Sequence, residues 1–297
     1  MSHPYVLLIL VVVFYAGNIL VGKAVNDLPP VTISFFRLLI AFIVLFPLGF
    51  RSAWQYKSTF IHYKKPFLLM TLTGIAFFNA FLYGALQFTT ATNASVLEAV
   101  IPAATALMSA VVLKEQLRGI QWLGILVSLL GSVWVVMDGR IFQVAAMPWN
   151  AGDGIMVGAI ICWAVYSITV KQYMHLFPSY GALLVMTGIS LLVLGPLVLI
   201  EWYMTGFSIQ LLAEAPGLVA GLLYLGIFPS FIALLLYNRA VGLLGASRAS
   251  VFLNFLPVAT MAGAYFWLGE TITSMHILGA LLVIAGVIMT TQVKREP

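Results

Sequence analysis

The sequence ATNASVLEAVIPAATALMSAVVLKEQL, residues 91–117, decides the fold because the chain repeats it later. Moved along by 155 residues, it aligns without a gap with ASRASVFLNFLPVATMAGAYFWLGETI, residues 246–272. Nine of the 27 positions are identical, and Pro102 falls on Pro257. Shared hydrophobicity alone does not produce matches of this kind. We therefore interpret the chain as two copies of one unit arranged around this element.

The composition is that of an integral membrane protein. Hydrophobic residues make up 62% of the chain, charged residues only 8%, and the mean hydropathy is +1.07. A soluble protein would carry about a quarter charged residues. The net charge of +5 comes from residues in short loops, so topology explains it better than a nucleic-acid partner does. A lone Cys162 and four scattered histidines favour neither a disulfide nor a metal site, and we expect no cofactor.

The hydrophobic segments predict the fold class. A helix needs about 20 mostly apolar residues to cross the hydrocarbon layer. Ten stretches meet that rule, at residues 4–25, 31–50, 66–88, 92–113, 118–137, 153–174, 181–201, 216–237, 246–267 and 275–292. We predict an all-α integral membrane protein with ten transmembrane helices, divided into a first repeat, 4–137, and a second repeat, 153–292.

The loops predict the orientation. Basic residues are enriched in the cytoplasmic loops of membrane proteins. With the N-terminus inside, the outer loops hold only two basic residues, Lys23 and Arg140. The cytoplasmic segments hold eleven: Arg51, Lys57, Lys64, Lys65, Lys114, Arg118, Lys171, Arg239, Arg248, Lys294 and Arg295. We therefore expect a multi-pass protein of a bacterial-type plasma (inner) membrane with both termini in the cytoplasm.

The number of spans per repeat gives the duplication a meaning. Because each copy has five spans, the second copy must enter the membrane upside down relative to the first. The openings of the two copies also correspond, with Tyr15 matching Trp163 at an offset of 148. Inverted repeats of this kind are typical of secondary carriers, whose solute site lies near the midplane between the repeats.

These features resemble the drug/metabolite transporter superfamily, specifically the carriers built from two EamA-type repeats. The resemblance is carried by two A-x-x-A-S-x-x-x-x-x-x-P segments that each end in a glutamate (Glu115, Glu270), and by the aromatic in each first helix (Tyr15, Trp163). Tyr15 stands where Trp is more usual, and Lys114 replaces the Gly of a leucine-glycine-glutamate signature. The resemblance implies a ten-helix secondary carrier, usually an exporter of amino acids, related metabolites or drugs, with a central cavity.

Two charged residues lie inside predicted spans. Glu98 corresponds to Leu253 in the other repeat, and Arg37 corresponds to Val185, so the fold itself does not require either charge. Each lies six residues from the outer end of its span, which is about 9 Å deep at 1.5 Å per residue. Asn18 lies at a similar level. A charge inside a span is costly and usually faces a cavity or a partner, so we predict a polar site here.

The two charges allow two interpretations. They can form a buried ion pair that only orders the helices. Alternatively, Arg37 and Glu98 bind the two charged ends of a zwitterion, or Glu98 exchanges a proton. A solute carboxylate arriving at Arg37 would change the proton affinity of Glu98, which supplies a physical route to proton-coupled antiport.

Further polar and aromatic residues are candidates for the pocket lining. Asn79 and Tyr83 are four residues apart and share a helix face, and Trp163 and Tyr166 are three apart and do the same. Asn254 lies in the ninth span. Apolar walls with a few polar groups suit a small-molecule site. The alternative is that the amides bond neighbouring helices and the aromatics face lipid.

The repeated segment carries prolines inside and glutamates at its end. Pro102 and Pro257 remove a backbone donor near the middle of their helices. They are either hinges for alternating access or static kinks that aid packing. Glu115 and Glu270 lie at helix ends near water, where we expect a structural or capping role.

Together these features predict a proton-coupled secondary active exporter of small metabolites, such as amino acids or their derivatives, that works by alternating access. Its expected partners are a small-molecule substrate, the lipid bilayer and the proton gradient, with the protein a monomer or homodimer. An alternative is an exporter of amphipathic or cationic drugs, and a remote one is an intramembrane lipid-modifying enzyme. The spans show no metal motif, no His–Asp pair and no nucleophile beside a base, so we do not expect an enzyme. A channel is disfavoured by the inverted repeat.

Overall fold

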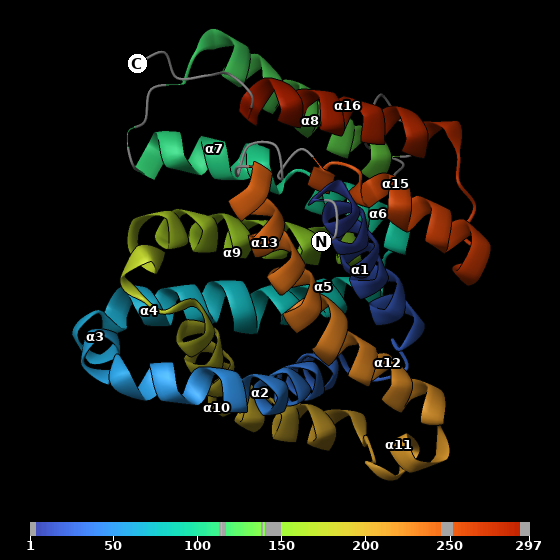
Figure 1. The fold of residues 1–297 in the computed structure, drawn as a ribbon. Helices are drawn as coiled ribbons and strands as arrows, with labels where there is room; N and C mark the ends of the chain where they lie inside the picture. Colours follow the sequence, from blue (N-terminus) through green and yellow to red (C-terminus); the bar gives the residue numbers. More distant parts are fainter. Residues whose placement is uncertain are drawn as a thin grey trace.

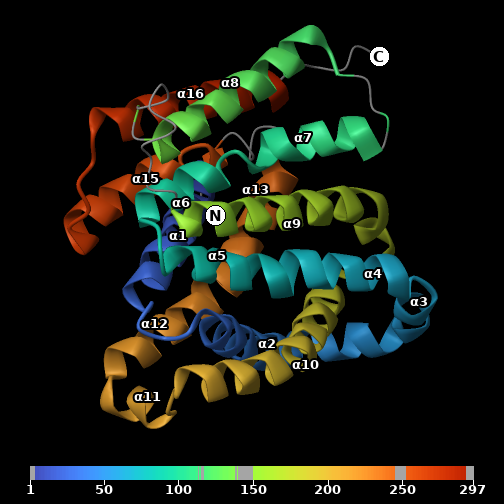
Figure 2. The same ribbon diagram turned by 180° about the vertical axis from the view of Figure 1, so that it is seen from behind.

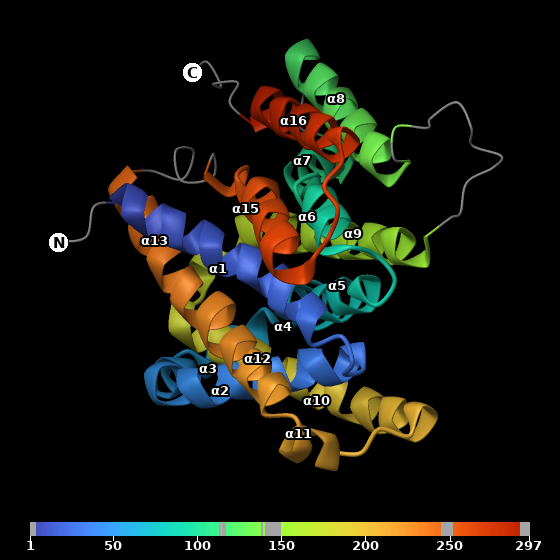
Figure 3. The same cartoon turned by 90° about the vertical axis from the view of Figure 1, so that its right-hand side faces the viewer.

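The structure is a computed structural model that describes residues 4–112, 114, 117–137, 139, 150–244 and 252–291. The regular structure of these residues is helical throughout. Figure 1 and Figure 2 show long helices stacked across the molecule, and Figure 3 shows them from the side. Helices suit a lipid environment because they satisfy their backbone hydrogen bonds internally.

The helices of the first half are α1 (Pro4–Ala24), α2 (Pro30–Gln55), α3 (Lys57–His62), α4 (Lys64–Met70), the π-helical η1 (Thr71–Phe77), α5 (Phe78–Leu86), α6 (Ala91–Glu98), α7 (Ile101–Val112) and α8 (Gly119–Val136). Those of the second half are α9 (Ala151–Tyr173), the short 3₁₀ helix η3 (Met174–Leu176), α10 (Ser179–Thr205), α11 (Gln210–Glu214), α12 (Pro216–Ile227), the π-helical η4 (Phe228–Ile232), α13 (Ala233–Leu244), α15 (Leu256–Gly263), the π-helical η5 (Ala264–Leu268) and α16 (Ser274–Thr291).

These helices confirm the predicted fold class. Within the described residues, eight helical segments are long and apolar enough to cross a membrane, and two shorter apolar helices lie at the predicted ninth and tenth spans. The third span is the continuous run α4-η1-α5, and the eighth is α12-η4-α13. The beginning of the ninth predicted span, at residues 246–251, lies outside the described residues.

The helix contacts follow the inverted repeat. Spans two and seven, α2 and α10, pack together at one edge of the bundle, and spans five and ten, α8 and α16, pack at the opposite edge (Figure 1, Figure 2). Span three packs on span six through α5 and α9, and the corresponding contact of span eight on span one is made by α13 and α1. Figure 3 shows α1 lying along α12 and α13 with α15 on its other side. The contacts of span three on span six and of span eight on span one are thus equivalent, with the two repeats exchanging places.

Both copies of the repeated segment are broken at the same position. A turn at residues 99–100 separates α6 from α7, and the corresponding turn at residues 254–255 precedes α15. In each break a backbone N–H bonds three residues back, from Val100 to Leu97 and from Phe255 to Phe252, at 3.1 and 3.0 Å. The breaks come just before Pro102 and Pro257, because each proline lacks the N–H that would continue the ladder. Movement about these prolines stays a prediction.

The contact between α8 and α16 depends on glycine. Gly124 and Gly131 in α8 face Gly286 and Gly279 in α16. A Cβ atom on Gly124 would lie 2.6 Å from the Gly286 carbonyl oxygen, and one on Gly279 would lie 3.0 Å from the Gly131 carbonyl oxygen. Any side chain here would therefore meet backbone. Small residues allow membrane helices to approach closely enough for extensive van der Waals contact.

The end of the ninth span meets the start of the fourth. Glu270, just after η5, accepts hydrogen bonds from the Ala91 and Thr92 backbone N–H groups at 2.7 and 3.1 Å and from the Thr92 hydroxyl at 2.7 Å. It therefore caps the N-terminus of α6, and its predicted capping role is confirmed. Because α6 and α15 also pack against each other, this contact shows that spans four and nine run in opposite directions. Glu115, its counterpart, lies outside the described residues.

A second carboxylate acts in the same way between spans seven and two. Glu201 in α10 accepts hydrogen bonds from the backbone N–H groups of Val31 and Thr32 at 2.9 and 2.8 Å, and from the Thr32 hydroxyl at 2.8 Å. Trp202 adds a bond from its indole N–H to the same hydroxyl at 2.9 Å. Two helices of the first repeat therefore begin against acids of the second.

The end of the bundle that carries Lys23, Ala91 and Glu270 is called the Lys23 end below. There the Lys23 ammonium donates to the carbonyl oxygens of Leu86 and Thr89 at 2.7 and 2.9 Å. The Thr89 hydroxyl donates to Asp153 in α9 at 2.6 Å. These bonds connect spans one, three and six, so the helices are closely tied together at the Lys23 end.

The residue at which the sequence departs from the family signature has an unusual backbone. Lys114 has a φ of 54° and its counterpart Gly269 a φ of 68°, both in the left-handed region. Glycine adopts this conformation without a steric penalty, whereas a residue with a Cβ atom pays roughly 1–2 kcal/mol. The glycine of the signature therefore serves as the turn that ends the helix.

Candidate functional site

Four of the predicted site residues form one hydrogen-bonded cluster. The Arg37 Nη1 atom of α2 donates to the Asn79 side-chain oxygen at 2.5 Å and to the Tyr83 hydroxyl at 2.6 Å, both on α5. The Tyr83 hydroxyl donates in turn to the Asn18 side-chain oxygen of α1 at 2.9 Å. The Arg37 Nε atom donates to the Ser230 hydroxyl of η4 at 2.8 Å. The cluster therefore joins spans one, two, three and eight.

The helix spacing explains why these side chains converge. Asn79 and Tyr83 are one turn apart on α5, so both face Arg37. The Asn79 amide is fixed by a bond to the Ile75 carbonyl oxygen at 2.7 Å. The Tyr83 ring lies against Gly22, where a Cβ atom would be only 2.6 Å from it. Arg37, Asn79 and Tyr83 are 8%, 5% and 0% exposed, so the guanidinium is held in a site closed to bulk water.

Some hydrogen-bond donors of the Arg37 guanidinium have no partner among the described residues. A guanidinium has five N–H donors. Three of them are committed to Ser230, Asn79 and Tyr83, and the two on Nη2 have no hydrogen bond among the described residues. All three partners are neutral. A buried cation that is hydrogen-bonded only to neutral groups is costly, so this site favours an anionic group on whatever binds there.

Glu98 lies at the helix break. It is the last residue of α6. Its Oε2 atom is buried and has no hydrogen-bond partner among the described residues. Glu98 and Arg37 interact electrostatically, but no ion pair joins these two described residues. In this conformation the pair thus does not have the geometry of a structural salt bridge, and each charge retains unused hydrogen-bonding capacity.

The aromatic candidates form a second group beside the cluster. The Trp163 ring of α9 lies 4.5 Å from the Phe78 ring and 5.1 Å from the Tyr166 ring, measured between centroids. Tyr166 packs against Gly74, where a Cβ atom would meet its ring at 2.2 Å. Tyr15 of α1 packs against the same buried core as Phe78 and Trp163. Phe78 directly precedes Asn79 on α5, so this aromatic group lies next to the Arg37 cluster.

The ninth predicted span contributes less than expected. Asn254 lies in the turn that breaks this span, one repeat away from the residue that follows Glu98. Its side chain makes no hydrogen bond to the described residues of the cluster. Sequence reasoning missed Ser230, which completes the cluster. The available signal was a hydroxyl residue directly after Pro229 within an apolar span.

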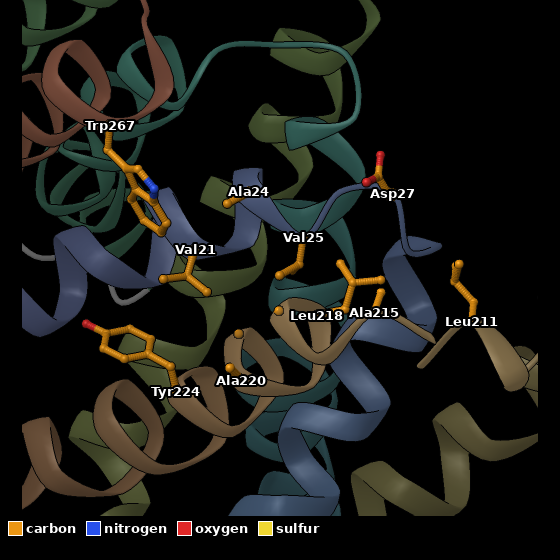
Figure 4. A pocket seen from close by; sticks show the side chains of 12 residues that line it. Val21, Ala24, Val25, Asp27, Leu211, Ala215, Leu218, Ala220, Tyr224 and Trp267 are labelled. Atoms are coloured by element: carbon orange, nitrogen blue, oxygen red, sulfur yellow. The ribbon is translucent and has the colours of Figure 1, made fainter. Parts of the chain in front are cut away.

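A separate cleft of about 620 Å³ opens near the Lys23 end between α1, α12 and η5. Figure 4 shows Trp267 and Tyr224 toward one end of the cleft and Asp27 and Leu211 toward the other. None of the predicted site residues lines it. Among the described residues, no three His, Cys, Asp or Glu side chains gather as metal ligands would.

Comparisons with known proteins agree with this architecture. The model of the EamA-like transporter family matches residues 3–137 and 150–292. The uncharacterized transporter YyaM of Bacillus subtilis is 26% identical over 255 residues, covering 86% of this chain and 80% of that protein. An uncharacterized transporter of Archaeoglobus fulgidus is 27% identical over 294 residues, covering 98% of each.

A crystal structure with 15% sequence identity superimposes with a TM-score of 0.65 over 97% of this chain and 96% of the other, which shows the shared fold. The family match covers nearly all of the sequence and accounts for the multi-pass helical architecture. This protein is a membrane transporter that belongs to the EamA-like transporter family.

Proposed function

We propose that this transporter is a secondary carrier that exports amino acids or their derivatives in exchange for protons, by alternating access. The carrier consists of two inverted repeats, residues 4–137 and 153–292. It lies in the plasma (bacterial inner) membrane with both termini in the cytoplasm, as the distribution of basic residues favours. The solute binds at the Arg37 cluster.

The observation that supports the substrate class is the unpaired state of two opposite charges. Within the part of the chain that the structure describes, Arg37 has two free donors on Nη2, and Glu98 has a buried Oε2 atom without a partner. A zwitterion supplies both missing partners, with its carboxylate at Arg37 and its ammonium group at Glu98. Charge-assisted hydrogen bonds of this kind are about twice as strong as neutral ones. The adjacent rings of Trp163 and Tyr166 supply an apolar wall for the rest of the solute.

Glu98 also supplies the coupling. A carboxylate in a site of low dielectric holds or releases a proton according to the charges near it. A solute ammonium group at Glu98 favours the ionised carboxylate, so binding of the solute displaces the proton from Glu98. When the solute leaves, Glu98 is again a buried carboxylate without that cation and can take up a proton. Solute and proton therefore compete for Glu98, which is what an exchange of one for the other requires.

The experiment is efflux from liposomes that contain the purified protein and a mixture of the twenty ¹⁴C-labelled L-amino acids, with an inward proton gradient. We expect saturable, gradient-dependent efflux of at least one of them. Arg37→Ala should abolish that efflux, because the solute carboxylate loses its partner. Ser190→Ala is the matched control, since the buried Ser190 hydroxyl has no hydrogen bond to any residue that the structure describes. Efflux that Arg37→Ala leaves unchanged would refute the proposed site.

The alternative is an exporter of cationic amphipathic drugs, in which Glu98 attracts the cation. The mostly apolar cleft of about 620 Å³ at the Lys23 end is the observation in its favour, because apolar walls suit a hydrophobic solute, although the cleft is separate from Glu98 and the Arg37 cluster. A cation site must overcome the repulsion of Arg37, so Arg37→Ala would then increase cation efflux. The same mutant in both assays separates the two functions.

A further inference from the structure

The eighth span contains a proline whose missing donor is replaced by a side chain. Pro229 lacks the N–H that would bond to the Leu225 carbonyl oxygen four residues back. Instead, the Ser230 hydroxyl donates to the Leu225 carbonyl oxygen at 2.7 Å. The local backbone is the π-helical turn η4. Such turns often lie at functional sites, because they differ from the regular helix by one inserted residue.

The same hydroxyl carries the bond to Arg37. A serine hydroxyl has one proton, and here that proton is committed to Leu225. Its lone pairs are left for the Arg37 Nε–H group, 2.8 Å away. The direction of both bonds is therefore fixed. Arg37 is held by the eighth span only while the π-helical turn keeps the Ser230 hydroxyl in this position.

The third span holds the other side of the guanidinium in a related way. Asn79 accepts a hydrogen bond from Arg37 Nη1 and donates to the Ile75 carbonyl oxygen, which belongs to the π-helical turn η1. The third spans of the two repeats thus each carry a π-helical turn, and each turn is linked to Arg37 through one side chain. Arg37 is therefore the residue through which the two turns are connected.

We propose that Ser230 is a positioning residue for the solute site. It orients Arg37 so that the two Nη2 donors stay free for a solute carboxylate, and it links the position of Arg37 to the η4 turn. A solute that draws the guanidinium toward itself stretches the hydrogen bond between Arg37 Nε and the Ser230 hydroxyl, and thereby shifts η4 in the second repeat. The solute part of this inference rests on the proposed function, whereas the link between Arg37 and η4 does not.

The link is tested first without any solute. Hydrogen–deuterium exchange is measured on the amides of residues 225–233 in the full chain in nanodiscs. Losing a hydrogen bond to a charged group removes roughly 1.4 kcal/mol or more, which corresponds to about tenfold faster exchange. We expect this increase in Ser230→Ala and in Arg37→Ala, no further increase in the double mutant, and wild-type exchange in Ser230→Thr and Ser190→Ala. Additive effects or unchanged exchange would overturn the link.

The positioning role is tested with one ¹⁴C-labelled amino acid that the wild-type protein exports from the mixture. We expect Ser230→Ala to raise the KM for this amino acid about tenfold. Ser230→Thr should restore the wild-type KM, because threonine keeps the hydroxyl. A fall in maximal rate with unchanged KM, or failure of Ser230→Thr to restore KM, would overturn the positioning role. If the wild-type protein moves no amino acid, the proposed function fails, while the exchange experiment still decides the link between Ser230 and Arg37.

Discussion

The carboxylate of Glu270 makes a prediction about stability that the structure allows to be worked out. It forms three hydrogen bonds at the start of α6, two to backbone N–H groups and one to the Thr92 hydroxyl. Replacing a helix cap by alanine costs about 1 kcal/mol. Losing a negative charge at a helix N-terminus adds roughly 0.3–1 kcal/mol. The electrostatic attraction of Lys23 is lost as well. Glu270→Ala should therefore destabilise the protein by about 2 kcal/mol.

The assay is thermal unfolding of the purified protein in detergent, followed by tryptophan fluorescence. On the scale of large soluble domains, 2 kcal/mol lowers Tm by about 4–8 °C. Glu270→Gln keeps one acceptor oxygen but loses the charge, so it should lower Tm by about half as much. Glu201→Ala removes an equivalent set of three bonds and should match Glu270→Ala. The control is Glu214→Gln, which changes the same charge at an exposed position.

The refuting result is specific. If Glu270→Ala unfolds within about 1 °C of the wild type while Glu201→Ala falls as expected, then the Glu270 cap does not stabilise the Lys23 end. A drop of equal size in Glu214→Gln would show that net charge, rather than capping, is responsible.

Three further predictions concern separate parts of the chain. Glu98→Gln should abolish pH-driven efflux but leave solute binding in a thermal-shift assay, because the amide can accept a hydrogen bond but cannot release a proton. Lys114→Gly should raise Tm by a few degrees, because it removes the steric cost, roughly 1 kcal/mol, of holding a residue with a Cβ atom in the left-handed conformation. Gly131→Leu should prevent accumulation of folded protein, as seen by size-exclusion chromatography, because its side chain would meet the α16 backbone; Gly154→Leu faces open space and should be tolerated.

The sequence predicted those features that depend on local patterns. The apolar runs predicted the helices. The repeated proline predicted a kink or a hinge in spans four and nine, where the structure has a break just before each proline. The spacing of Asn79 and Tyr83 predicted that they share one helix face, and in the structure that face meets Arg37. Asn18 was predicted to lie at a depth similar to that of Arg37, and in the structure it belongs to the same cluster. These predictions rest on distances along one helix, which the sequence contains directly.

Contacts between helices were harder to predict. Ser230 reaches Arg37 only because the eighth span packs beside the second, and nothing local indicates that pairing. The role of Glu201 as a cap for α2 depends in the same way on tertiary packing. An ion pair between Arg37 and Glu98 was one of two open interpretations, and depth alone did not exclude it. The structure instead gives Arg37 three neutral partners, because their helices lie closer.

The unmatched charges have a consequence for how such a molecule came to be assembled. A carrier made from two identical subunits must place every ionic group twice, so one arginine would face a second across the symmetry axis. A single chain with two copies is free of that constraint. Here Val185 and Leu253 stand where a strict copy would have a second arginine and a second glutamate. Fusion of the two copies thus allows the membrane interior to hold one cation and one anion instead of two like-charged pairs.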